Sequence, residues 1–160
     1  MDGGTIQIDN SFSNQINIIN IQFVISMMSI EEDIENTLDI LNRLKEEEAV
    51  IIVEGQKDIE SLVNLGIKNR IITASRHNIF DVIDDIYEKE VIVLTDFDKK
   101  GTYLFKRYVK ELQSSGKKVI TIYYRDLKMY LKKYIIQIEQ IYPFLKNRDV
   151  LDDNEDLIWE

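Results

Sequence analysis

Three acidic side chains in this chain could do metal chemistry, because each closely follows a short apolar run. Glu54 comes directly after residues 49–53, and Asp96 and Asp98 come just after residues 91–94. Both runs are continuous and mostly β-branched, which is typical of strands that a parallel sheet buries on both faces. In such sheets the working groups lie just beyond the carboxyl ends of the strands. We therefore expect the three carboxylates to lie at one edge of a sheet.

This arrangement would suit a hard divalent cation. Alternate residues of an extended chain point the same way, so Asp96 and Asp98 can share one volume while Phe97 turns into the protein. Neighbouring strands lie about 4.8 Å apart, which would bring Glu54 within reach of both. Carboxylates that close repel one another unless a cation holds them. All-oxygen ligation favours Mg²⁺, with Mn²⁺ as a substitute, and the absence of cysteine, with His77 the only histidine, disfavours zinc.

The same residues resemble the Toprim domain, which primases, topoisomerases and several nucleases share. The family pattern is Glu-Gly at the end of one strand and Asp-x-Asp at the end of a later strand. Here Glu54-Gly55 and Asp96-Phe97-Asp98 match that pattern in the same order. Phosphatases of the haloacid-dehalogenase type also carry an acidic pair, but on their first strand, so the order of the motifs favours Toprim.

The longer stretches 53–67 and 91–101 look like the small, free-standing, primase-like Toprim proteins found mainly in archaea. The resemblance covers roughly residues 48–133 and continues more weakly to residue 145. It implies that Glu54, Asp96 and Asp98 bind Mg²⁺, and that Glu54 serves as a general acid or base or as a metal ligand.

The residues around these motifs have supporting roles in the resemblance. It places a recurring acid at Asp58, although an acid there equally suits the first turn of a helix. Gly55 and Gly101 are expected to let the backbone approach a ligand closely. The basic side chains near the motifs are candidates for binding phosphate or nucleic acid, and they are Lys57, Arg76, Lys99, Lys100, Arg107 and Lys110.

The net charge of −9 is unevenly distributed along the chain. Residues 1–48 carry a net −8 and residues 135–160 a net −5, whereas residues 99–133 hold 11 basic and 2 acidic side chains. A basic run that starts at the acidic motif predicts non-specific binding of DNA or RNA through residues 99–133. The alternative is that these cations only solvate outer helices. A protein partner or a homodimer stays open as well.

The order of apolar runs predicts the α/β fold class. Strands expected over 49–53, 70–73, 91–94 and 118–123 alternate with helical patterns. This alternation calls for a single Toprim domain of Rossmann-like type, with about four mainly parallel strands and helices on both faces. We expect an N-terminal extension over 1–28, the Toprim domain with its leading helix over 29–134, and a C-terminal helix with an acidic tail over 135–160.

The first thirty residues allow two interpretations. Ser29 followed by Glu32 reads as a capping box, which would start a helix over residues 30–47 and leave 1–26 as an upstream extension. The rival interpretation is a hairpin with strands at 5–8 and 16–25. Neither a signal peptide nor a membrane span is expected, and the lack of cysteine suits a cytoplasmic protein.

These observations predict a Mg²⁺-dependent, nucleic-acid-binding Toprim protein that performs or assists phosphodiester chemistry, as primases and nucleases do. The alternative is a non-catalytic module that binds a metal with a nucleotide or RNA and acts through a partner enzyme. Whether the chain itself is an enzyme stays open, because the further domains of full-length primases and topoisomerases have no counterpart in this sequence.

Overall fold

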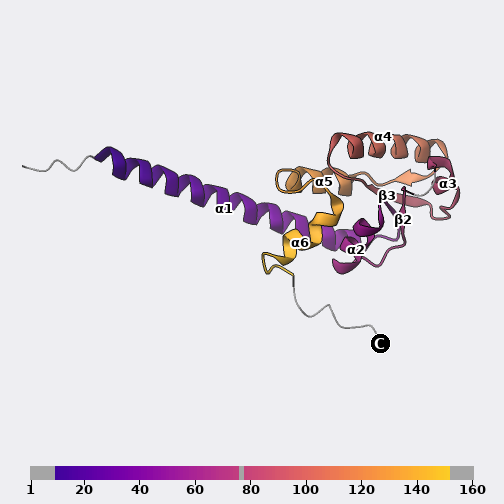
Figure 1. Ribbon diagram of the computed structural model, residues 1–160. Helices are drawn as coiled ribbons and strands as arrows, with labels where there is room; N and C mark the ends of the chain where they lie inside the picture. Colours follow the sequence, from indigo (N-terminus) through magenta and orange to yellow (C-terminus); the bar gives the residue numbers. More distant parts are fainter. Residues whose placement is uncertain (1–9, 76–77, 152–160) are drawn as a thin grey trace, which may run out of the picture.

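A computed structural model describes residues 10–75 and 78–151 of the chain, with side chains from residue 15 onward. Its centre is a four-stranded sheet in the order β2-β1-β3-β4, in which every neighbouring pair is parallel. The strands are β1 (Val50–Val53), β2 (Ile71–Thr73), β3 (Glu90–Leu94) and β4 (Lys118–Val119). This confirms the predicted α/β fold with a parallel sheet (Figure 1).

Helices cover both faces of the sheet. They are α1 (Asn10–Lys45), α2 (Gln56–Asn64), α3 (Ile79–Asp84), α4 (Lys99–Ser114), α5 (Ile122–Leu131), the 3-10 helix η1 (Ile138–Gln140) and α6 (Ile141–Lys146). Alternation along β1 sends Ile51 and Val53 to the face covered by α1, α2, α5 and α6. It sends Val50 and Ile52 to the face covered by α3 and α4.

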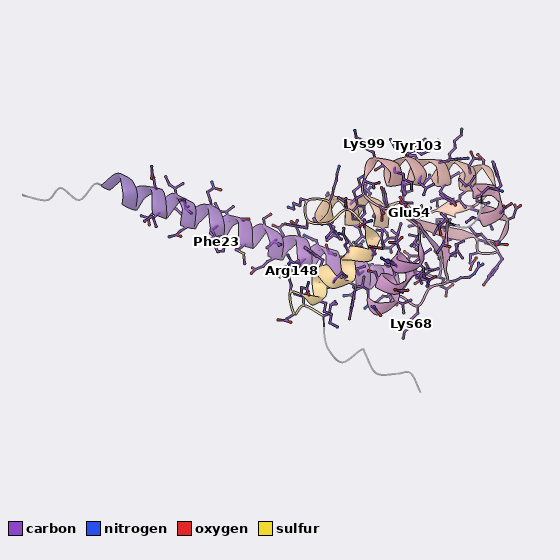
Figure 2. The ribbon with its side chains drawn as sticks, in the orientation of Figure 1. Phe23, Glu54, Lys68, Lys99, Tyr103 and Arg148 are labelled. Atoms are coloured by element: carbon purple, nitrogen blue, oxygen red, sulfur yellow. The ribbon has the colours of Figure 1, made fainter. Side chains whose placement is uncertain are left out.

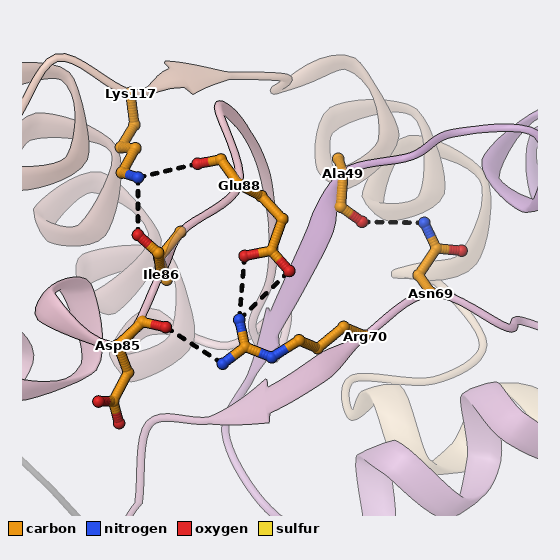
Figure 3. A network of polar contacts seen from close by, with 7 residues as sticks. All are labelled: Ala49, Asn69, Arg70, Asp85, Ile86, Glu88 and Lys117. Atoms are coloured by element: carbon orange, nitrogen blue, oxygen red, sulfur yellow. Dashed lines mark hydrogen bonds and ion pairs between the residues drawn. The ribbon is translucent and has the colours of Figure 1, made fainter.

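A network of polar contacts closes the amino ends of the strands. Figure 3 shows its members, which are Ala49, Asn69, Arg70, Asp85, Ile86, Glu88 and Lys117. The Arg70 guanidinium pairs with the Glu88 carboxylate at 2.9 Å. Lys117 Nζ donates to the carbonyl oxygens of Ile86, at 2.7 Å, and Glu88, at 2.8 Å. The charged groups at this edge of the sheet therefore stabilise the fold.

The leading helix is longer than predicted. α1 begins at Asn10 and passes through Ser29 without a break, so the predicted start at Ser29 is wrong, as is a strand at 16–25. Extending a helix costs far less than nucleating one, and residues 10–30 contain no glycine or proline to stop it. The alternative strand at 5–8 lies outside the described residues. No helix among the described residues is long and apolar enough to cross a membrane.

The fourth strand is shorter than predicted. β4 ends at Val119 instead of reaching Tyr123, and α5 begins at Ile122. This edge strand pairs only with β3, so few ladder hydrogen bonds favour its extension. Tyr123 and Tyr124 are instead buried in the core as members of α5. Burial of a helical face therefore outweighs the β-branched character of this run.

Candidate metal and nucleic-acid site

The structure brings Glu54 and Asp96 together at the carboxyl ends of β1 and β3. Val53 and Leu94 are register partners, so the residues that follow them leave the sheet side by side. The Asp96 N–H donates to Glu54 Oε1 at 3.0 Å. Phe97 is only 1% exposed, as the alternation of side chains predicted. Sequence reasoning therefore located this edge of the sheet correctly.

Asp98 lies at the same edge but points elsewhere. Its Oδ1 accepts from the Gly101 N–H at 2.6 Å, so the carboxylate caps the N-terminus of α4. Among the described residues, no three acidic or histidine side chains are placed to hold one metal ion. The predicted ligand set of Glu54, Asp96 and Asp98 is therefore not gathered in this conformation.

A C-terminal turn closes over the acidic edge, and the sequence did not predict this contact. The Ile138 N–H donates to Asp96 Oδ1 and the Glu139 N–H donates to Asp58 Oδ1, both at 3.0 Å. The other oxygen of Asp58 accepts from the Gly55 N–H at 2.9 Å. Asp58 is thus buried and held at both oxygens, which suits a residue that supports the site.

Gln140 gives this turn its shape. Its Oε1 accepts from the N–H groups of Ile136, at 3.1 Å, and Gln137, at 3.0 Å. These contacts orient the segment whose next two N–H groups reach Asp96 and Asp58. The only sequence signal for the turn was the weak continuation of the Toprim resemblance through residues 138–145.

The acidic edge carries negative charge that no cation of the described residues offsets. Burial, together with the charges of Glu54, Asp58 and Asp98, raises the pKa of Asp96 to about 6, although the hydrogen bond from the Ile138 N–H opposes the shift. Burial, with the charges of Glu139 and Glu54, also raises the pKa of Asp58. None of these five acids forms an ion pair within the described residues. An all-oxygen, electronegative edge has the chemistry of a site for a hard divalent cation.

Gly101 and Gly55 differ in the space around their α-carbons. A Cβ added to Gly101 would lie 2.0 Å from the carbonyl oxygen of Asp96, so only glycine lets α4 start this close to the end of β3. The buried Thr95 hydroxyl donates to the Gly101 carbonyl at 2.7 Å and holds the same approach. A Cβ at Gly55 would meet nothing within 4 Å. Gly101 therefore permits a close approach within the protein's own backbone, and the approach of a ligand to Gly55 and Gly101 stays a prediction.

The basic run 99–133 divides into two sets. Five of its cations have partners within the fold, and they are Lys117, Lys118, Arg125, Lys128 and Lys133. The other six are exposed and have no acidic partner among the described residues; they are Lys99, Lys100, Lys106, Arg107, Lys110 and Lys132. Because all but Lys132 belong to α4, the free positive charge is concentrated on that helix.

A groove of about 500 Å³ runs along α4, where Lys106 and Lys110 line it. A second groove of about 510 Å³ lies over α5 and the lysines that follow it. Neither groove includes a carboxylate of the acidic edge. Figure 2 shows Lys99 and Tyr103 on the outer side of α4, and Tyr103 is 66% exposed. Lys57 is also exposed, whereas Arg76 and His77 lie outside the described residues.

Comparison with known proteins defines the class. Residues 48–123 match the Toprim domain, so the parallel sheet and its acidic edge are those of a Toprim protein. This match indicates a metal-dependent function related to nucleic acids. The C-terminal turn that contacts Asp96 and Asp58 lies beyond the matched residues.

Similar proteins define the family. A UPF0292 protein of Methanocaldococcus jannaschii is 35% identical over 126 residues, which is 76% of this chain and 98% of that relative. A UPF0292 protein of Pyrococcus abyssi is 44% identical over 64% of this chain and 79% of its own length. A solved structure of a protein from Aquifex aeolicus, 32% identical, has a TM-score of 0.55 and covers 64% of this chain and 95% of its own. The chain belongs to the UPF0292 family of small archaeal Toprim proteins.

Proposed function

We propose that this protein binds Mg²⁺ at Glu54, Asp96 and Asp98, binds nucleic acid on α4, and takes part in phosphodiester chemistry where the two meet. One observation supports this proposal above the others. Among the described residues, Asp96 and Asp98 form no ion pair, and neither do Lys99 and Lys100, which follow Asp98 directly in the chain. A phosphate backbone and a divalent cation together would neutralise both sets.

The acidic side chains have distinct roles in this proposal. Glu54 keeps Oε1 on the Asp96 N–H, which leaves Oε2 to bind the cation or to move a proton. Asp98 would release the Gly101 N–H to join Asp96 on the ion. When bound, Mg²⁺, or Mn²⁺ in its place, would polarise a phosphoryl oxygen and stabilise the charge that develops during phosphoryl transfer. Asp58 would hold the Gly55 and Glu139 backbone beside the site.

The cations of α4 would supply the affinity for DNA or RNA. Lys99 and Lys100 adjoin the acidic motif, and Lys106, Arg107 and Lys110 continue along the helix. Contacts of this kind to phosphate give salt-sensitive binding without reading the sequence of bases. Lys57 and Arg76 are further candidates for phosphate contacts.

A second candidate function is a non-catalytic module that binds a metal and a nucleotide or RNA for a partner enzyme. The observation that favours it is the present arrangement of the carboxylates. Glu54, Asp96 and Asp98 each accept a hydrogen bond from a backbone N–H, and no three acidic side chains of the described residues are gathered around one point.

The test is a mobility-shift assay of labelled single- and double-stranded DNA and RNA with the full chain, in Mg²⁺ and in EDTA, at several salt concentrations. The same samples are run on a denaturing gel. Salt-sensitive shifts with new bands only in Mg²⁺ support the enzyme, and those bands should disappear in the double variant Asp96→Asn with Asp98→Asn. Shifts without products support the binding module. No shift at low salt contradicts binding of nucleic acid on α4 and leaves only the nucleotide-binding form of the second function.

A matched pair of variants locates the nucleic-acid surface. Lys106→Gln with Lys110→Gln should lower the slope of log affinity against log salt concentration by about two, because each phosphate contact contributes roughly one. The control is Lys68→Gln with Lys89→Gln, which removes the same charge from exposed positions elsewhere. Figure 2 shows Lys68 on the far side of the domain from Lys99. Equal losses in the two variants would contradict binding on α4.

A further inference from the structure

The first half of α1 carries a large exposed apolar surface. All residues from 15 to 29 are exposed, and the helix projects away from the domain (Figure 1). Its large apolar side chains are 45–66% exposed; they are Ile16, Ile18, Ile19, Ile21, Phe23, Val24, Ile25, Met27 and Met28. A monomeric protein rarely leaves so many neighbouring apolar side chains in water, and a helix of this composition is normally covered.

The exposed surface continues a face of α1 that the domain already covers. One stripe of the helix repeats every seven residues, and its members are Ile16, Phe23, Ile30, Thr37 and Leu44. Thr37 and Leu44 are fully buried, whereas Phe23 is 65% exposed and lies on the part of α1 that projects beyond the domain (Figure 2). A seven-residue repeat of mainly apolar residues is one of the two that helices use when they pair in coiled coils. Within the part of the chain that the structure describes, the stripe therefore has a helical partner in its second half and lacks one in its first.

The partner of the second half is α5, which lies antiparallel to α1. Near the start of α5, the Tyr123 hydroxyl donates to Glu47 Oε1 at 2.5 Å. Just beyond its end, Lys133 pairs with Asp33 at 2.5 Å, which the Tyr134 hydroxyl also contacts. A second helix that continued the line of α5 along the exposed stripe would also run antiparallel to α1.

The distribution of charge along α1 is compatible with a second copy of the chain as the source of this helix. Residues 10–30 contain no charged side chain, whereas residues 31–48 contain eight acids and two bases. A lipid surface would normally require Lys or Arg along the helix, and there is none. Two antiparallel copies would pair their uncharged halves and keep their acidic segments at opposite ends, which minimises repulsion between chains of net charge −9.

We propose that two copies of this protein dimerise through an antiparallel pairing of α1 over residues 15–29. In this arrangement, Phe23 of one copy packs against Ile19 of the other. The flanking polar residues Gln15, Gln22 and Ser29 also recur at seven-residue spacing. Gln22 then lies at the two-fold axis, and Gln15 of each copy faces Ser29 of the other. This proposal is independent of the metal and nucleic-acid site.

The first test measures the mass of the full chain by sedimentation velocity over a wide range of concentration. A dimer supports the proposal, and a larger assembly contradicts it. Phe23→Asp should weaken association by about 30-fold or more, as the loss of a central interface side chain does. Asn17→Asp adds the same charge off the stripe and should leave association unchanged. A monomer at all concentrations, or equal effects of the two variants, would overturn the proposal.

The second test determines the direction of pairing. The chain has no cysteine, so an introduced cysteine is the only thiol. A mixture of Gln15→Cys and Ser29→Cys chains should give an oxidised hetero-dimer in high yield, and neither variant alone should cross-link efficiently. Efficient cross-linking of each variant with itself, and not of the mixture, would indicate parallel pairing and contradict the proposal. Far-UV circular dichroism confirms that every variant keeps its helix.

Discussion

The charged side chains at the amino ends of the strands are paired within the protein, whereas those at the carboxyl ends are not paired within the described residues. At the amino ends of the strands, Arg70 pairs with Glu88 and Lys117 donates to two carbonyl oxygens, so these cations have partners. At the carboxyl ends, Glu54 and Asp96 accept from backbone N–H groups and have no cationic partner among the described residues. The first edge stabilises the fold, whereas the second leaves charge available for a ligand.

The comparison separates two kinds of polar residue that sequence alone does not distinguish. An ion pair within the protein contributes to stability and needs nothing further. Partly buried carboxylates held close together without a counter-ion reduce stability, and a cation would relieve that cost. Substitutions at the amino edge should therefore change stability alone, whereas those at the carboxyl edge should change stability and ligand binding in opposite directions.

The largest effect on stability is expected from Gly101→Ala. The added Cβ would lie 2.0 Å from the Asp96 carbonyl oxygen, so the backbone must move, at a cost of about 3 kcal/mol. Gly55→Ala is the matched control, because its Cβ would have no neighbour within 4 Å. Urea unfolding of both variants measures the difference. If Gly101→Ala is as stable as Gly55→Ala, the close approach of α4 to β3 is not as described.

A smaller loss is expected from Arg70→Ala at the amino edge. Glu88 is only 15% exposed in the Arg70 pair, so removing Arg70 leaves a mostly buried carboxylate without its partner. The loss should be about 2 kcal/mol by urea unfolding, with no change in metal binding. Arg125→Ala removes a pair whose arginine is 70% exposed, and it should cost less than about 0.5 kcal/mol. Equal losses in the two variants would contradict the larger contribution expected of the Arg70–Glu88 pair.

Gln140→Ala should weaken metal binding at the carboxyl edge without unfolding the domain. Gln140 orients the turn whose N–H groups hold Asp96 and Asp58, and loss of such outer contacts typically lowers metal affinity about tenfold. Gln140→Glu keeps an oxygen acceptor and should recover part of the affinity, while Gln113→Ala on the outside of α4 should have no effect. Calorimetric titration with Mg²⁺ provides the measurement. Unchanged affinity in Gln140→Ala would remove the turn from the site.

Asp96→Asn should stabilise the metal-free protein by a pH-dependent amount. The pKa of Asp96 is about 6 in the folded chain against an ordinary value of 3.8, so the folded state binds more protons between these values. Wild-type stability therefore falls as pH rises from about 4 to 6. Since solvent partly screens Asp96, the gain for Asp96→Asn in EDTA should be about 1 kcal/mol above pH 7 and absent below pH 4. A gain that is the same at both pH values would contradict the burial and charge described for Asp96.

Local sequence was sufficient to predict much of the fold. The residues of β1 and β3 are apolar on both faces of each strand. Both faces are buried when helices cover a parallel sheet on its two sides. Residues 118–123 form a similar apolar run, but the strand that they begin, β4, lies at an edge of the sheet. Tyr123 and Tyr124 are buried because they belong to the helix α5. Ser29 and Glu32 have the residue types of a helix start, yet that pattern is equally compatible with the interior of a longer helix.

The site was predictable only as far as strand order determines it. Adjacent parallel strands bring Glu54 to Asp96, and the alternation of side chains buries Phe97. The C-terminal turn joins residues 42 and 81 positions apart in the sequence, and no local pattern encodes such a contact. Asp98 caps the N-terminus of α4 in the structure, whereas the sequence predicted it as a metal ligand. An aspartate suits both roles, so the residue type alone does not determine the orientation of its side chain.

The central claim is that the carboxyl edge binds a divalent cation, and a Mn²⁺ titration followed by electron paramagnetic resonance tests it most directly. The wild-type chain should remove Mn²⁺ from solution at a saturable site of one or two ions. Asp96→Asn with Asp98→Asn should abolish that site, whereas Glu60→Gln with Asp84→Asn, the same charge change at exposed positions, should retain it. Equal Mn²⁺ binding by the wild-type chain and the Asp96, Asp98 double variant would contradict the account.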